Sequence, residues 1–159
     1  MSRCARLGGL AAALLTLSGC AFTGIDLVQD TRVSVQSPTD GATVTVPFNV
    51  TWKSRAKALG HIVSYAVFVD KTPVKSGHTL RDTVPSTDTG CHRDPACPDT
   101  SYLARHDVYV VSEPEVTIPR VPDADQAHKA HRIIIIILID GKRDGEGAFA
   151  RTLYVKAAA

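Results

Sequence analysis

Apolar and polar residues alternate along most of the chain after position 31, as in β-strands that bury one face. The alternation is clearest in three successive runs, whose apolar positions are Val33 and Val35, then Ala42, Val44 and Val46, then Phe48, Val50 and Trp52. Ser37–Gly41 separates the first two runs and has the composition of a turn. We therefore expect these runs to form a sheet with one face in the core.

Two later segments are apolar at nearly every position. They are His61–Asp70 and Arg132–Asp140, and the second contains the unbroken apolar run Ile133–Ile139. β-Branched residues favour a strand here, and apolar residues on both faces indicate a central position in a sheet. An isoleucine face on the outside of a sheet must be covered or must meet a partner. We expect the long polar segment 71–100 to supply the cover.

The remaining strands are predicted at 107–112, at 115–119 with Val116 and Ile118 on one face, and at 148–156. The segment 71–100 is rich in Pro, Asp, Thr and Gly, and we expect at most a short strand near 79–84. No segment has a clear amphipathic helical pattern. Roughly seven to nine short strands in one domain predict an all-β fold, an antiparallel two-sheet sandwich.

The first 19 residues have the organisation of an export signal. Arg3 and Arg6 precede the apolar run Leu7–Leu17. That run is shorter than the roughly 20 apolar residues that a helix needs to cross a bilayer, but it suits a cleavable signal peptide. We expect residues 1–19 to be removed during export.

The signal ends in Leu17, Ser18, Gly19 and Cys20, which resembles the lipobox of bacterial lipoproteins. The resemblance implies cleavage between Gly19 and Cys20 and a diacylglyceryl group, with fatty acyl chains such as palmitate, on Cys20. Two acyl chains, at about 0.8 kcal/mol per buried CH₂, anchor a protein stably. We expect residues 20–30 to be a lipidated tether and residues 31–159 to be the folded domain. The domain would then lie on the extracytoplasmic face of the cell membrane or outer membrane.

The charge balance argues against nucleic acid as a partner. The chain has 18 Lys and Arg and 16 Asp and Glu, a formal net charge of +2. Two of the basic residues, Arg3 and Arg6, lie in the signal segment, so the rest of the chain is formally neutral. Its basic residues are scattered, whereas nucleic-acid binding needs them clustered.

Four cysteines are present. Cys4 is lost with the signal and Cys20 takes the lipid, which leaves Cys91 and Cys97. In an oxidising extracytoplasmic compartment this pair, separated by a polar loop that contains proline, is expected to form a disulfide.

A metal site is the alternative use of the same loop, because His92 adjoins Cys91 and His106 follows. We disfavour it because zinc sites usually draw their ligands as close pairs, two to four residues apart. The glycine-rich turn 140–147 carries three carboxylates, but its spacing does not match a calcium loop. We expect no metal and no other cofactor.

The order of predicted strands and of their characteristic residues also resembles fibronectin type III and related bacterial immunoglobulin-like domains, over about Val33–Val155. The features that carry the resemblance are the opening Ser37–Ala42, the strand ending in Trp52, the following strand with Tyr65, the segment Val116–Val121 and the long penultimate strand. The resemblance implies a β-sandwich whose end loops are available for binding.

The expected function is that of a binding or scaffold module of the cell envelope, with the Cys91–Cys97 loop as contact surface and an envelope protein or a glycan as partner. No recognised catalytic motif is present, so we favour binding over catalysis. Two alternatives stay open. One is an accessory envelope enzyme with a dispersed site, and the other is a structural module that dimerises through the isoleucine strand. The enzyme's candidate residues are His92, Asp94, Asp99 and His106.

Overall fold

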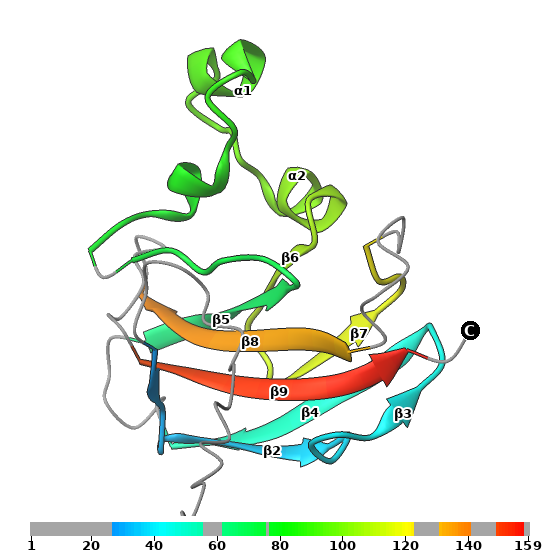
Figure 1. Ribbon diagram of the computed structural model, residues 1–159. Helices are drawn as coiled ribbons and strands as arrows, with labels where there is room; N and C mark the ends of the chain where they lie inside the picture. Colours follow the sequence, from blue (N-terminus) through cyan, green and yellow to red (C-terminus); the bar gives the residue numbers. More distant parts are fainter. Residues whose placement is uncertain (1–26, 56–61, 76, 123–130, 141–148, 158–159) are drawn as a thin grey trace, which may run out of the picture.

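The computed structural model describes residues 27–55, 62–75, 77–122, 131–140 and 149–157. They form two β-sheets packed face to face, with short helices in one long connection (Figure 1). The fold is therefore mostly β and has two sheets, as the alternation predicts. The predicted signal peptide, with Gly19 and Cys20 at its end, and the 141–147 turn lie outside the described residues.

The smaller sheet has the strand order β2-β4-β7 and is antiparallel. Its strands are β2 (Val33–Ser37), β4 (Phe48–Ser54) and β7 (Glu115–Ile118). Val50 and Trp52 of β4 are buried, while Asn49 and Lys53 on either side of them are exposed. The predicted one-sided burial of this strand is confirmed.

The larger sheet has the order β1-β9-β8-β5-β6, and β3 also pairs with β9. Its strands are β1 (Val28–Gln29), β3 (Thr43–Val44), β5 (Ile62–Val69), β6 (Val108–Val111), β8 (His131–Asp140) and β9 (Phe149–Ala157). β5 and β8 lie inside the sheet, as their two apolar faces predict.

The expectation of an antiparallel arrangement throughout is wrong for two short pairs. β1 and β3 run parallel to β9 and pair near its opposite ends, Val28 beside Phe149 and Thr43 beside Lys156. They supply partners to backbone groups on the outer edge of β9, which an edge strand otherwise leaves unpaired. A two-residue strand has too little alternation for its direction to be read from sequence.

The main core lies between the two sheets. Trp52 of β4 packs edge-on against Tyr65 of β5, with 5.1 Å between the ring centroids, and Ile134, Ile136 and Leu138 of β8 belong to the same cluster. Burying one such side chain contributes about 1.5–3 kcal/mol.

The other face of the larger sheet carries a second core. Ile135, Ile137 and Ile139 of β8 join Phe68 of β5 there. Val74, Leu80 and Leu103 from the connection between β5 and β6 cover them. The prediction that the segment after β5 covers the isoleucine face is confirmed.

We call this connection, residues 71–107, the excursion. It contains the 3-10 helix η2 (Leu80–Thr83) and the helices α1 (Thr89–Arg93) and α2 (Thr100–Arg105). At most a short strand was expected near 79–84; the chain forms a 3-10 helix there instead, and the helices were not foreseen. Each has only one or two turns, too few for a 3.6-residue periodicity to appear.

The first described strand lies within the segment that the sequence analysis assigns to the tether. Val28 and Gln29 pair with β9, and Asp30 is buried. Regular structure thus begins before Thr31. Within the described residues, none of the helices has the length and apolar character needed to cross a bilayer.

Candidate functional site

The excursion rises from the larger sheet and holds the candidate contact surface, with α1 at its outer end (Figure 1). An aspartate with left-handed backbone stands at each of its junctions with the sandwich, Asp70 (φ 51°) just before it and Asp107 (φ 61°) at its end. Aspartate tolerates this conformation better than most residues. Arg132 lies 2.9 Å from Asp70, and Arg120 lies 2.9 Å from Asp107. These ion pairs hold the two junctions of the excursion against the sandwich.

The short helices begin at capping side chains. Asp88 accepts a 3.0 Å hydrogen bond from the N–H of Cys91, and Asp99 accepts a 2.6 Å bond from the N–H of Tyr102. Thr79 and Asp82 form a capping box around η2. Such caps satisfy backbone donors that the first turn leaves unpaired. They explain why this polar sequence folds into helical turns.

The structure joins Cys91 and Cys97 in a disulfide, with their Cα atoms 5.2 Å apart. Cys91 lies buried in α1, whereas Cys97 follows the turn at Pro95 and Ala96. The predicted pairing of these two cysteines agrees with this geometry. The bond joins the middle of α1 to the segment that leads into α2.

Arg81 of η2 also fixes this loop, through hydrogen bonds to its backbone. Its guanidinium donates to four backbone carbonyls. The acceptors are Cys91 O (3.3 Å), His92 O (2.6 Å), Asp94 O (3.2 Å) and Cys97 O (2.7 Å). The cation lies where the last carbonyls of α1 carry partial negative charge. The role of Arg81 could not be predicted from the sequence, because every residue of the loop carries a backbone carbonyl whatever its side chain.

A side-chain contact joins α1 to α2. The Tyr102 hydroxyl donates a 2.8 Å hydrogen bond to Asp88, and the His106 ring stacks on Tyr102 with centroids 4.4 Å apart. The Cys91 N–H, and after it the Tyr102 hydroxyl, lower the pKa of Asp88 from its usual value. Desolvation, and after it the bond to Asp88, raises the pKa of Tyr102. The contact is therefore strongest with Asp88 ionised and Tyr102 neutral.

The loop that these contacts hold is exposed at its outer surface. His92, Arg93, Asp94, Pro95 and Ala96 are five consecutive exposed residues. They offer a cation, an anion, an imidazole and a small apolar surface on a backbone fastened at both ends. Such a surface is suited to recognition of a partner, because little conformational freedom remains to be lost on binding.

The four residues of the enzyme hypothesis are each engaged locally. Asp94 accepts from the N–H of Ala96 and Asp99 caps α2. His92 lies 3.1 Å from the carbonyl of Pro85, and His106 stacks on Tyr102. In the described part of the chain, none of these contacts joins two of the four. The structure does not bring them together as a reaction centre.

The metal hypothesis finds no ligand set among the residues that the structure describes. No three His, Cys, Asp or Glu side chains gather there in a way that could hold an ion. Cys91 and Cys97, two of the proposed ligands, are bonded to each other.

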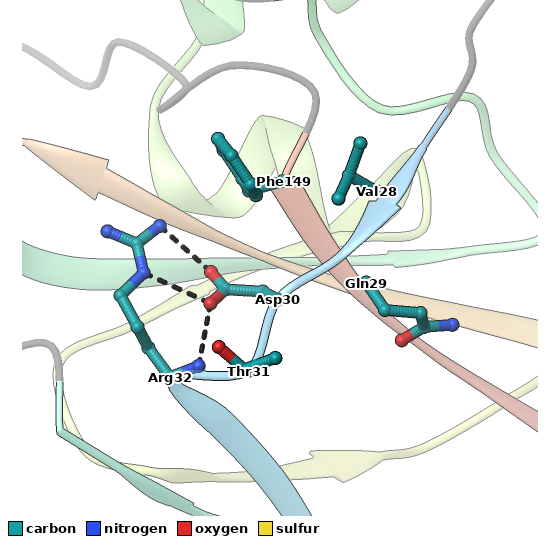
Figure 2. Close-up of a pocket in the computed structure, with 6 residues that line it drawn as sticks. All are labelled: Val28, Gln29, Asp30, Thr31, Arg32 and Phe149. Atoms are coloured by element: carbon teal, nitrogen blue, oxygen red, sulfur yellow. Dashed lines mark hydrogen bonds and ion pairs between the residues drawn. The ribbon is translucent and has the colours of Figure 1, made fainter.

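A separate hollow of about 650 Å³ lies where the chain enters the larger sheet. Its lining consists of residues 28–32 and Phe149 (Figure 2). Arg32 forms a two-pronged ion pair with the buried Asp30, with N–O distances of 3.0 and 2.9 Å. Its guanidinium also lies 5.8 Å from the centroid of the Phe149 ring. No local sequence pattern indicates this hollow, because it depends on a pairing between residues far apart in the chain.

Comparison with known proteins found no matching family, no matching curated protein and no matching solved structure.

Proposed function

We propose that this protein is a lipid-anchored extracytoplasmic module that binds a component of the cell envelope, a protein or a glycan, through the Cys91–Cys97 loop. The observation that carries the proposal is the double fastening of an exposed loop, by the disulfide and by Arg81. These two contacts fix the loop, so little backbone freedom remains to be lost when it binds a partner.

The inner and outer parts of the excursion have different environments. Leu80 and Leu103 are buried against the isoleucine face, whereas residues 92–96 are exposed. The inner part thus completes the core, and the outer part is available to a partner. Binding and catalytic residues are often found on loops that a rigid scaffold positions in this way.

The anchor is proposed from the lipobox that ends at Cys20. Seven residues from Cys20 to Leu27 can span at most about 25 Å, so β1 would lie near the bilayer surface. In the strand order, β1 and β6 occupy opposite ends of the larger sheet, and the excursion leads into β6. This order supports an arrangement in which the excursion is directed away from the membrane.

We further propose a fibronectin type III-like subtype for the sandwich. The order of strands supports it, because β2, β4 and β7 share one sheet while β5, β6, β8 and β9 share the other. Successive crossings between two sheets are a feature of Greek-key sandwiches.

The anchor is tested by mass spectrometry of the protein isolated from membranes of an expressing bacterium. We expect the N-terminal residue to be Cys20 carrying a diacylglyceryl group, and a Cys20→Ser variant to remain unlipidated and uncleaved. An unmodified thiol at Cys20 in the mature protein would contradict the proposal.

The contact surface is tested by placing a photo-crosslinking amino acid at Ala96 in the loop or at Thr45 on the sandwich. Both residues are exposed, so the second position serves as the matched control. We expect a discrete crosslinked product in intact cells from position 96 only. If both positions give the same products, or position 96 gives none, the loop is not the contact surface.

A further inference from the structure

Two half-exposed apolar side chains lie side by side at the edge where the chain enters the larger sheet. Val28 is 52% exposed and Phe149 is 47% exposed, and they are register partners in β1 and β9. They point to the same side, whereas Gln29 points away (Figure 2). Among the described residues, the other large apolar side chains exposed to this extent are Val46 and Tyr154.

Strand geometry explains the exposure. Side chains alternate along β9, so Phe149 lies on the same face as Leu153 and Val155, which belong to the core between the sheets. At Phe149 that face is only partly covered, with the guanidinium of Arg32 beside the ring. The two side chains therefore form the lip of the hollow instead of part of the core.

The rest of the hollow is polar but balanced in charge. Asp30 is 2% exposed and bonded to Arg32, whose guanidinium lies beside the Phe149 ring. The pair fixes the turn between β1 and β2, because Asp30 also accepts from the backbone N–H of Arg32. An apolar lip beside an internally neutralised ion pair is compatible with the interfacial region of a lipid bilayer.

The chain that precedes the described residues enters the structure at this lip. Leu27 adjoins Val28, and Cys20 lies seven residues earlier. Val28 is therefore eight residues from Cys20, which limits the β1 edge to within about 29 Å of a lipidated Cys20. Tyr154 lies five residues further along β9, roughly 17 Å from Phe149, so it can lie farther from the anchor.

We propose that Val28 and Phe149 dock onto the phospholipid bilayer that holds the anchor, with both side chains in its interfacial region. The contact orients the sandwich so that the excursion faces away from the membrane. This inference rests on the proposed lipid anchor at Cys20.

The test places a tryptophan reporter at the lip. Full-length protein is expressed, isolated in its mature lipidated form and reconstituted into phosphatidylcholine and phosphatidylglycerol vesicles, with or without bromine on the acyl chains. Phe149→Trp is compared with Tyr154→Trp, a matched aromatic position on the same strand. The native Trp52 is buried in the core, so the unsubstituted protein supplies the background.

We expect brominated lipid to quench most of the emission added by Phe149→Trp and little of that added by Tyr154→Trp. Equal quenching of the two reporters, or quenching of neither, would overturn the docking. Val28→Trp is a second reporter at the lip, should Phe149→Trp fail to fold, and it is expected to behave as Phe149→Trp does.

Co-sedimentation with the vesicles separates the two proposals. If the protein is lipidated and co-sediments but shows no selective quenching, the anchor proposal stands and the docking proposal is overturned. Protein that carries no lipid on Cys20 and stays in the supernatant overturns both. A lip that meets a second copy of the chain would give no lipid quenching and a doubled mass in solution, which also overturns the docking.

Discussion

The Tyr102 hydroxyl donates a 2.8 Å hydrogen bond to Asp88, and this contact holds α1 against α2 in the outer part of the excursion. Asp88 also caps α1, so one carboxylate serves both helices. The arrangement makes the excursion sensitive to pH at a defined residue.

Acid should weaken the excursion through Asp88. Its pKa in the folded protein is lower than the ordinary value of 3.8. The stabilisation is therefore fully present above that ordinary value and is lost as the pH falls through the lower folded value. Urea unfolding of the protein and of Asp88→Asn, measured from pH 5 downward, should show less loss on acidification in the variant. Glu115→Gln on β7 is the control, and an Asp88→Asn profile identical to that of the unsubstituted protein would contradict the prediction.

Replacement of Arg81 should destabilise the loop more than replacement of the exposed Arg93 in α1. Arg81→Lys loses the planar fork that reaches four carbonyls, and we expect a loss of about 2 kcal/mol in the free energy of unfolding. Among the described residues the Arg93 side chain bonds to Thr89 of its own helix, so Arg93→Lys should cost less than about 0.5 kcal/mol. Urea unfolding measures both, and similar losses would mean that Arg81 does not hold the loop.

Removal of the disulfide should leave the sandwich folded. Closing so short a ring restricts the unfolded chain by about 2 kcal/mol, and neither cysteine belongs to the core between the sheets. We expect a Cys91→Ser, Cys97→Ser variant to keep its far-ultraviolet circular dichroism. Backbone amides of the loop should exchange with solvent faster, while those of β8 stay protected. Loss of protection in β8 as well would show that the sandwich depends on the disulfide.

Because the excursion packs on one face of β8, substitutions in the excursion should be energetically coupled to substitutions on that face and not to those on the other face. Leu103 and Ile137 belong to one core, whereas Ile136 belongs to the other. Each alanine substitution should cost about 2–5 kcal/mol. In double-mutant cycles Leu103→Ala and Ile137→Ala should be non-additive, and Leu103→Ala and Ile136→Ala should add. Additivity in both cycles would contradict the packing of the excursion on β8.

The strands and their buried faces could be predicted from sequence because a strand's side chains alternate locally. Val50 with Trp52, and Val116 with Ile118, point inward as their spacing indicates. The run Ile133–Ile139 indicated a strand buried on both faces, and its residues divide between two cores. The Cys91–Cys97 pair could also be predicted, by elimination among four cysteines.

Tertiary structure alone decided the rest of the candidate surface. Arg81 holds the loop through backbone carbonyls, which every residue carries, so no side-chain pattern could identify its partners. The pairing of Val28 with Phe149 joins residues at opposite ends of the chain, and it creates a hollow that neither strand possesses alone. Sequence determined which faces of the strands are apolar, since that is a local property of alternation. Whether each of those faces is covered depends on contacts between segments that are distant in the chain. Only the tertiary structure therefore shows which faces are buried.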